Sequence, residues 1–267
     1  AFGYPKKNNP RRSAGCGKVT NLASGKFDIA FADTVRSYVI NVPASYDVNK
    51  PYRLVFGMHP MGGSAAKVAT DNWFNLMPLD ADNSTIWVAP QGEVNGTWTR
   101  GAKDHMFFDS LLYKVEQEAC IDTSRVFAVG FSFGAMFTHS LARSHQRVLR
   151  GVVAYAPGEV NIYGPPENVL PLAWMGTSGV SDGTVTPTMS RTARNRFVNY
   201  NGGDSTRSMA EVSAGSKGHV CSNYPDVKER FPVRWCSFDG THTDRPVDDG
   251  ASTSWIPADT WKFITQF

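Results

Sequence analysis

The chain has 267 residues, of which 41% are hydrophobic and 19% charged, and its formal net charge is +3 at pH 7. This composition is typical of a globular protein and excludes an intrinsically disordered chain. No stretch approaches the roughly 18 apolar residues of a membrane-spanning helix, and no basic block is large enough to indicate nucleic-acid binding. We expect residues 1–267 to form one monomeric α/β domain that binds neither nucleic acid nor membrane.

Cysteine content and the start of the chain favour an exported protein. Four cysteines occur without a close CxxC pair, which suits two disulfides better than a zinc site; they are Cys16, Cys120, Cys221 and Cys236. N-glycosylation sequons begin at Asn83 and Asn95. The chain starts without Met or the apolar core of a signal peptide, as a processed form would. We therefore expect a secreted, extracellular glycoprotein. Of three possible pairings we favour Cys16–Cys120 with Cys221–Cys236.

Taken in chain order, the sequence begins with an arm and continues as alternating strands and helices. Residues 1–25 are rich in Lys, Asn, Pro, Gly and Ser and predict an extended arm over the domain surface. β-branched and aromatic runs predict strands at 36–42, 53–58, 85–89, 125–130, 151–156, 170–175 and 233–238. Helical patterns lie at 107–118, 133–146, 188–200 and 257–266. This alternation predicts an α/β fold with a mostly parallel central sheet and helices on both faces.

The strongest chemical signal is Gly130-Phe131-Ser132-Phe133-Gly134. A G-x-S-x-G pattern between a strand and a helix is a nucleophile elbow, in which the serine sits on a strained turn. Side chains at the glycine positions would clash with the strand and helix. A chance match is possible in a chain with 24 glycines, but the strand and helix predicted on either side favour the elbow. Ser132 is therefore the candidate nucleophile, and the pattern indicates the α/β-hydrolase fold.

In this fold the acid and then the base follow the nucleophile along the chain, each on a loop after a strand. His242 directly follows the last predicted strand, so we assign it as the general base, with His219 as a second choice. His139 and His145 fall in the predicted helix after the elbow and suit packing or surface roles. Asp182 is the first carboxylate after the strand predicted at 170–175, and we assign it as the acid that orients His242. Helix capping or a turn is its alternative role.

Two backbone amides should form the oxyanion hole. The first is the N–H of Phe133, the residue after the nucleophile. The second should come from the loop His59-Pro60-Met61-Gly62-Gly63. Pro60 has no N–H to donate, which leaves Met61 as the expected donor and Gly62 as the next choice. His59 is expected to hold this loop by a hydrogen bond.

These segments together resemble the secreted fungal feruloyl esterases of the carbohydrate esterase family 1 type, which are related to polyhydroxybutyrate depolymerases. The resemblance covers nearly the whole chain and is carried by SAGCGK, FGMHPMGGS, APQG followed by TW, CIDTSRVFAVGFSFGAM, GTSGVSD and PVRWCSFDGTHTDRP closed by TWKFITQF. It implies hydrolysis of ferulate esterified to arabinose on plant xylan, without a metal or organic cofactor. Its triad falls on Ser132, Asp182 and His242. The chain departs from its relatives in GFSFGA, where they often have Tyr after Ser and Gly in place of Ala135.

An aromatic acyl group calls for a flat apolar slot with a polar end. Trp98, Phe133 and Met61 lie on motif loops and are the expected wall residues, although each could instead pack in the core. Two other interpretations stay open. One is an acetyl xylan esterase or polyester depolymerase with the same triad, which would hydrolyse hydroxycinnamates poorly. The other is a catalytically silent carbohydrate-binding relative.

Overall fold

The computed structural model describes residues 9–20 and 22–267 of the chain. Residues 1–8 and Asn21, part of the predicted N-terminal arm, lie outside the described residues. The described start of the arm is fixed to the body of the fold. An isolated bridge pairs Arg12 with Asp122, and the Arg11 amide donates to Asp122 Oδ1 at 2.9 Å. A disulfide joins Cys16 to Cys120.

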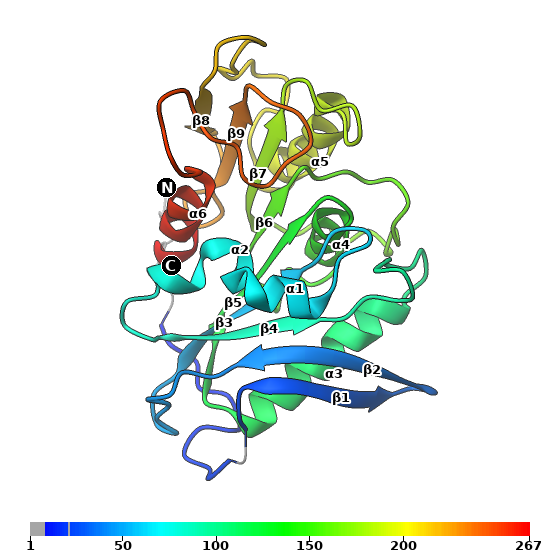
Figure 1. Ribbon diagram of the computed structural model, residues 1–267, viewed down its shortest axis with the longest axis vertical. Helices are drawn as coiled ribbons and strands as arrows, with labels where there is room; N and C mark the ends of the chain where they lie inside the picture. Colours follow the sequence, from blue (N-terminus) through cyan, green and yellow to red (C-terminus); the bar gives the residue numbers. More distant parts are fainter. Residues whose placement is uncertain (1–8, 21) are drawn as a thin grey trace.

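One nine-stranded sheet runs through the described residues in the order β1-β2-β4-β3-β5-β6-β7-β9-β8 (Figure 1). Its strands are β1 (Gly25–Phe31), β2 (Thr34–Asn41), β3 (Tyr52–Met58), β4 (Thr85–Pro90), β5 (Ile121–Phe131), β6 (Gly151–Tyr155), β7 (Ala173–Gly179), β8 (His219–Asn223) and β9 (Val233–Phe238). The central pairings from β4 to β9 are parallel, whereas β1–β2, β2–β4 and β8–β9 are antiparallel. The prediction of a mostly parallel sheet is confirmed.

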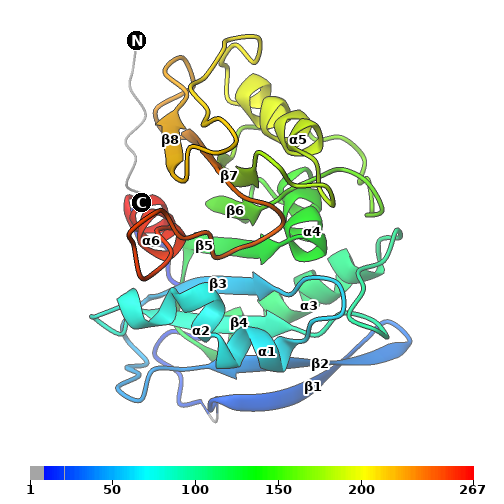
Figure 2. The ribbon, with the colours of Figure 1, turned by 45° about the horizontal axis from the view of Figure 1, so that its top comes forward.

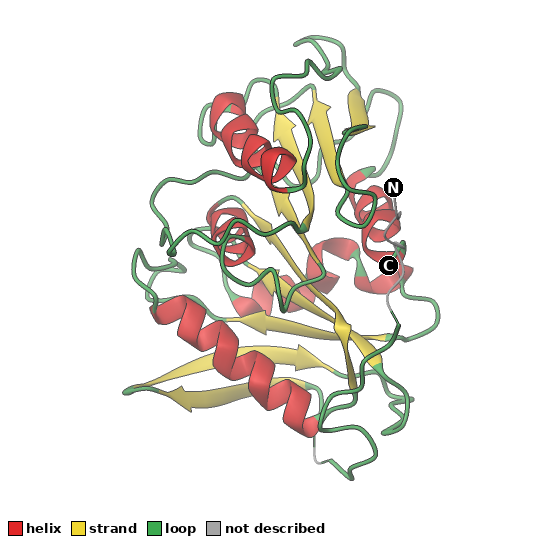
Figure 3. Cartoon of the chain, turned by 180° about the vertical axis from the view of Figure 1, so that it is seen from behind, coloured by secondary structure: helices red, strands yellow, loops and turns green. Residues whose placement is uncertain are grey.

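Helices cover both faces of the sheet (Figures 2 and 3). One face carries α3 (Lys103–Glu118), α4 (Phe133–Ala142) and α5 (Pro187–Tyr200). The other carries α1 (Ala65–Thr70), α2 (Asn72–Asn75) and α6 (Ile256–Thr265), with the short helix η1 (Met77–Leu79) following α2. Strand alternation divides the core accordingly, since Val126 of β5 packs in the first layer and Phe127 in the second. Within the described residues, no helix is long and apolar enough to cross a bilayer.

The structure changes several predicted boundaries. The strand predicted at 170–175 is β7, which begins at Ala173 and continues to Gly179, so residues 177–179 belong to the sheet and not to a loop. The helix predicted at 133–146 ends at Ala142, because turns close over the next residues, with the His145 and Ser144 amides bonding to Leu141 O. Edge strands β1 and β8 were missed because their partly exposed residues give no continuous apolar signal.

One disulfide lies beside the central strand and the other at an edge of the sheet. Cys16–Cys120 spans 104 residues and ties the N-terminal segment to the start of β5. Cys221–Cys236 spans 15 residues and joins directly paired residues of β8 and β9. These are the pairings that the sequence favours. Asn83 and Asn95 lie exposed in turns with positive φ, where a glycan would have access, and their modification stays a prediction.

Candidate active site

Ser132 occupies a strained turn at the carboxyl end of the central strand β5. Its backbone angles are φ 54° and ψ −119°, a region that non-glycine residues rarely occupy. The strand ends at Phe131 and α4 begins at Phe133, so the whole change of direction is made at this residue. The Ser132 amide donates to Tyr155 O of β6 at 2.9 Å, which holds the turn against the neighbouring strand. This geometry is that of a nucleophile elbow.

The two glycines of the motif allow strand and helix to approach this closely. A Cβ on Gly130 would lie 2.3 Å from Gly134 O, which no packing could accommodate. A Cβ on Gly134 would lie 2.1 Å from Met58 O and 2.5 Å from His59 O. The start of α4 therefore packs directly against the backbone that follows β3. This contact places the loop after β3 beside Ser132.

Ser132, His242 and Asp182 form a continuous chain of hydrogen bonds. His242 Nε2 lies 2.7 Å from Ser132 Oγ, and His242 Nδ1 lies 2.7 Å from Asp182 Oδ2. The Asp182 carboxylate is fully buried, whereas the His242 side chain is 21% exposed. The Asp182 Oδ1 atom accepts from the amides of Thr184 and Val185 at 2.8 and 2.9 Å. The nucleophile, base and acid predicted from sequence are thus brought together.

Backbone contacts after β7 and β9 explain why the acid and base meet. These neighbouring strands are parallel and end at the same edge of the sheet. Beyond their ends, Ser181 N donates to Gly240 O at 3.0 Å and Val180 N donates to Phe238 O at 2.9 Å. The loops that carry Asp182 and His242 are therefore joined by backbone hydrogen bonds, which bring the two side chains close together.

The other histidines that were considered as the base form hydrogen bonds to carboxylates away from Ser132. His219 Nδ1 lies 2.6 Å from Asp248 Oδ2, and its ring stacks on Trp255 with centroids 3.9 Å apart. His139 is buried in α4 and bonds to Glu159 Oε1 at 2.8 Å. His145 bonds to Asp109 Oδ1 at 2.9 Å from the turn after α4. None of them contacts Ser132 through a hydrogen bond within the described part of the chain.

The predicted oxyanion donors lie on the two backbone segments that meet at Gly134. Phe133 is the first residue of α4, so its N–H has no acceptor within the helix. Gly62 N donates to Asn95 O at 3.1 Å and Gly63 N to Pro60 O at 2.9 Å, so both amides are already used. Among residues 9–20 and 22–267, the Met61 amide has no acceptor. Met61 therefore remains the expected second donor, and Gly62 is a poor alternative.

His59 fixes the oxyanion loop from inside. It is fully buried, and its Nε2 accepts from Gly92 N at 2.8 Å. Its Nδ1–H then donates to Pro60 O at 2.9 Å. Burial lowers the pKa of His59, which keeps the ring neutral and this pattern of bonds intact. The loop is thus held by a rigid side chain, in the structural role expected of His59.

The structure places two of the three expected pocket residues in the core. Trp98 is 2% exposed; its ring stacks between His59 and Phe137, and its Nε1 donates to His59 O at 3.0 Å. Trp98 therefore supports the oxyanion loop from behind and does not form an open wall. Phe133 is 6% exposed and packs in the core layer of α3 and α4, while Met61 is 63% exposed at the surface.

A cavity of about 240 Å³ lies next to the triad. The Phe131 ring, which lines it, lies 4.8 Å from the His242 ring between centroids. The oxyanion loop, helices α1 and α2, and the segment after His242 supply its other lining residues: His59, Pro60, Gly63, Ser64, Lys67, Val68, Asp71, Phe74, Asp244 and Arg245. Sequence reasoning missed Asp244 and Arg245, although they follow His242 within the motif GTHTDRP.

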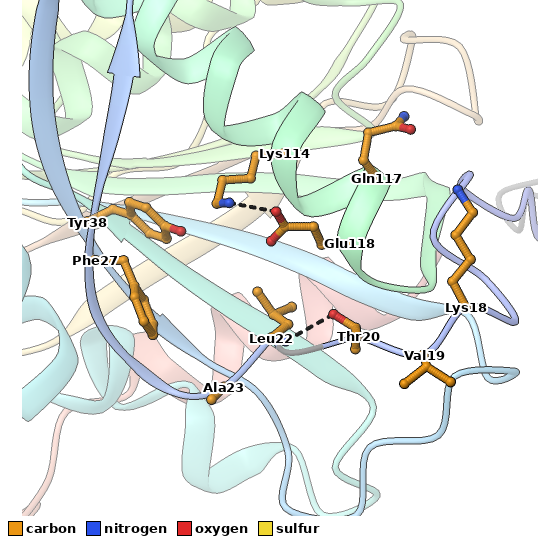
Figure 4. Close-up of a pocket in the computed structure, with 10 residues that line it drawn as sticks. All are labelled: Lys18, Val19, Thr20, Leu22, Ala23, Phe27, Tyr38, Lys114, Gln117 and Glu118. Carbon is orange, nitrogen blue, oxygen red and sulfur yellow. Dashed lines mark hydrogen bonds and ion pairs between the residues drawn. The ribbon is translucent and has the colours of Figure 1, made fainter.

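A second hollow of about 420 Å³ lies far from Ser132 (Figure 4). Leu22, Phe27 and Tyr38 line one side, and the Lys114–Glu118 ion pair at the end of α3 lines the other. At this hollow α3 ends and β5 begins, whereas the elbow lies at the other end of β5. At 3.3 Å per residue, nearly the whole strand gives a separation of about 30 Å. It contains no predicted site residue.

One group of side chains in the described residues has the spacing of a metal site: Cys221, Cys236 and Asp259. Both sulfurs are joined in a disulfide, so the group offers no thiolate. Asp259 is also engaged by Arg234 through two hydrogen bonds of 2.6 Å. These residues stabilise the β8–β9 edge and provide no donor set for a metal.

Comparison with known proteins found no matching family model but close sequence relatives. The chain is 32% identical to feruloyl esterase D of Neurospora crassa, with 96% of this chain and 90% of that protein covered. It is 34% identical to a probable feruloyl esterase C of Aspergillus clavatus, covering 95% and 90%. It is 31% identical to feruloyl esterase C of Emericella nidulans, covering 99% and 95%.

Solved structures share the fold at lower identity. An acetyl xylan esterase from Aspergillus awamori superposes with a TM-score of 0.67 at 13% identity, covering 91% of this chain and 100% of that chain. A ferulic acid esterase from Anaeromyces mucronatus gives a TM-score of 0.62 at 15% identity, covering 94% and 93%. These similarities confirm the predicted esterase-type α/β fold.

Proposed function

Because the chain belongs to the family of the fungal feruloyl esterases C and D, we propose that it releases ferulic acid from its esters through a Ser132–His242–Asp182 triad. The hydrogen-bonded chain from Ser132 Oγ through His242 to Asp182 is the observation that carries this proposal. A serine nucleophile needs a base within hydrogen-bond reach and a third group to orient that base. The nucleophile, the base and the group that orients the base all lie at one edge of the sheet.

The first half of the reaction forms an acyl-enzyme. Ser132 Oγ attacks the ester carbonyl carbon while His242 Nε2 takes the hydroxyl proton. The oxygen of the tetrahedral intermediate is then stabilised by the N–H groups of Phe133 and Met61. Asp182 stabilises the imidazolium through Nδ1–H. The intermediate collapses with cleavage of the ester C–O bond, and His242 gives the proton to the departing alcohol.

The second half restores the enzyme. A water molecule gives a proton to His242 Nε2 and attacks the acyl carbonyl. The new tetrahedral intermediate is held by the same two amides. Collapse breaks the bond to Ser132 Oγ, which regains its proton from His242, and the free carboxylic acid leaves. His242 mediates every proton transfer in this cycle.

The family further favours feruloylated arabinoxylan, or oligosaccharides derived from it, as the substrate. Two disulfides suit an oxidising, extracellular location. We retain the expectation of a secreted single-domain monomer. The continuous sheet, with a core layer on each face, supports the single domain.

The test is hydrolysis of methyl ferulate beside an acetyl ester by the wild type and Ser132→Ala. Ser110→Ala is a matched control, since its hydroxyl bonds to Met106 O within α3. We expect ferulate release by the wild type and the control, and loss of turnover in Ser132→Ala. Turnover of the acetyl ester alone would retain the triad and favour an acetyl xylan esterase or polyester depolymerase. Full activity of Ser132→Ala would overturn the mechanism, and no turnover of any ester would favour a silent carbohydrate-binding relative.

A further inference from the structure

The cavity beside the triad is lined by both apolar and charged residues. Val68, Phe74 and Phe131 supply apolar wall, and Phe131 directly precedes the nucleophile. Asp244 and Arg245, two and three residues after the base, also line it. The cavity is therefore lined by residues that are close in the chain to both the nucleophile and the base.

The two carboxylates of the cavity differ in how well they are paired. Asp71 Oδ1 lies 2.6 Å from Lys67 Nζ, and Asp71 Oδ2 lies 2.6 Å from Arg245 Nη2. Asp244 has a weaker set of contacts within the described residues: Arg245 Nε at 3.9 Å and its own backbone amide. Because Arg245 bonds more closely to Asp71 than to Asp244, the Asp244 carboxylate can accept further hydrogen bonds.

Asp244 is partly buried at the cavity. The Asp244 side chain is 18% exposed, and burial raises its pKa above the ordinary carboxyl value. Neither Asp244 oxygen is both fully buried and unpartnered. Because the residue lines the cavity and a carboxylate has several acceptor sites, it can accept a further hydrogen bond there. A donor carried by a ligand in the cavity would find an acceptor in this carboxylate. The ligand should then be apolar over most of its surface, with a hydroxyl at one end.

We propose that this cavity binds the hydroxyphenyl ring of the substrate's acyl group, and that Asp244 accepts a hydrogen bond from the phenolic hydroxyl. This inference rests on the proposed feruloyl ester hydrolysis and names the residue that recognises the acyl group. A cavity of about 150 Å³ holds benzene, so 240 Å³ leaves room for a ring with hydroxyl and methoxy substituents. Val68, Phe74 and Phe131 would contact the ring.

The sugar of the substrate is the other possible occupant. A furanose carries several hydroxyl groups, each of which needs a polar partner when it is buried. The apolar wall of Val68, Phe74 and Phe131 offers none, and Asp71 is already bonded to two cations. One incompletely paired carboxylate among apolar lining residues matches a phenol better than a sugar.

The test compares methyl ferulate with methyl 3,4-dimethoxycinnamate, which has the same ring without the phenolic hydrogen. A hydrogen bond to a charged group predicts a wild-type preference for ferulate in kcat/KM of about 10- to 100-fold. In Asp244→Leu, which has no acceptor, this preference should fall to below about 3-fold, and Asp244→Asn should fall between the two. Each ratio is read within one variant, so a general loss of activity does not affect it.

Asp249→Asn is the matched control, because this carboxylate follows the same loop and is 73% exposed. It should keep the wild-type preference. The cavity assignment is overturned if the wild type shows no preference, or if Asp244→Leu retains it. It is also overturned if the substitutions act on feruloyl arabinose but not on the methyl esters, since the cavity would then hold the sugar.

An acetyl ester, which carries no ring, separates failure of this inference from failure of the proposed function. A wild type that hydrolyses only the acetyl ester contradicts the feruloyl activity itself. A wild type that hydrolyses both cinnamates, with a preference that Asp244→Leu leaves intact, contradicts only the role of Asp244. Should Asp244→Leu fail to fold, the wild-type preference and the Asp244→Asn ratio decide.

Discussion

The Asp182 carboxylate holds His242 with one oxygen and the backbone with the other. Oδ2 lies 2.7 Å from His242 Nδ1, while Oδ1 accepts from the amides of Thr184 and Val185. Both backbone amides are donors, so the atom at the Oδ1 position must be an acceptor oxygen. The orientation of the carboxylate is therefore set by the loop, independently of the imidazole, and His242 is held in the tautomer with hydrogen on Nδ1 and a free lone pair on Nε2.

Replacing Asp182 with Asn should abolish turnover while leaving the fold intact. The asparagine oxygen should face the Thr184 and Val185 amides, which turns its NH₂ group towards His242 Nδ1. The ring must then accept at Nδ1 and carry its hydrogen on Nε2, so it cannot take the Ser132 proton. We expect kcat to fall by about 10⁴-fold, as the same change does in Ser-His-Asp enzymes. Steady-state hydrolysis of methyl ferulate measures it.

Asp226→Asn is the control for that substitution, because Asp226 pairs with Arg207 at the exposed surface. It should retain wild-type turnover. A loss of less than about tenfold in Asp182→Asn, with normal circular dichroism, would show that Asp182 does not orient the base.

The oxyanion role of Met61 predicts different effects for two substitutions at this position. Met61→Pro removes the N–H, whereas Met61→Ala keeps it and removes only a side chain that is 63% exposed. The proline variant should lose about 10²- to 10³-fold in kcat, with a much smaller change in the alanine variant. Equal losses in both would indicate that the side chain matters and the amide does not. Parallel kinetics on methyl ferulate measure both effects.

Gly134→Ala should damage stability and catalysis together. The new Cβ would meet Met58 O at 2.1 Å and His59 O at 2.5 Å, so α4 and the oxyanion loop must separate. We expect a loss of about 1–3 kcal/mol in the free energy of unfolding and a lower kcat in the protein that remains folded. Gly183→Ala is the control, since its Cβ would meet nothing within 4 Å. Urea unfolding and ester hydrolysis of both variants test this, and an unaffected Gly134→Ala would contradict the packing.

The elbow and the triad order were predictable because they depend on local spacing and strand order. Ser132 lies between two glycines at a strand–helix junction, and His242 and Asp182 follow strands that end at one edge of a parallel sheet. The strand before Asp182 was placed too early, because the residues that continue β7 to Gly179 include Thr and Ser, whose side chains are buried by tertiary packing. Asp182 nevertheless lies against His242, as its predicted role requires.

The cavity could not be predicted in the same way. Its walls come from the loop after β3, α1, α2, β5 and the loop after β9, and only the tertiary fold brings these segments together. Trp98 shows the same limit, since the sequence places it on a motif loop but does not say whether it lines the pocket or packs in the core. The stacking of Trp98 between His59 and Phe137 depends on the docking of α4 against that loop.

The two disulfides should differ in their contribution to stability. Cys16–Cys120 closes a loop of 104 residues and Cys221–Cys236 one of 15. Chain entropy predicts contributions of about 4.7 and 3 kcal/mol for loops of roughly these lengths. The double Cys→Ser variants, compared by urea unfolding, should be destabilised in that order. The opposite order would indicate that the Cys16–Cys120 segment is held by other contacts, such as the Arg11–Asp122 hydrogen bond.

Acid should destabilise the fold partly through His105, which is buried in α3. Its Nε2 lies 2.8 Å from Ser140 Oγ, and that hydroxyl donates to Tyr163 O, so the histidine must supply the hydrogen. Burial, with the charge of His145 as a smaller cause, lowers the pKa of His105 to about 3 from an ordinary value of 6.5. Between these values the unfolded chain binds a proton that the folded chain does not.

The stability that His105 contributes is therefore complete above pH 6.5 and is lost as the pH falls towards 3. His105→Gln can still donate to Ser140 but does not titrate. As the pH falls, the free energy of unfolding should decrease less steeply in this variant than in the wild type. The two slopes should differ by up to about 1.4 kcal/mol per pH unit. Buried His59 and His139 titrate in both proteins and cancel in the comparison. Urea unfolding from pH 7 to pH 4 gives both slopes, and parallel slopes would show that His105 is not held neutral in the folded protein.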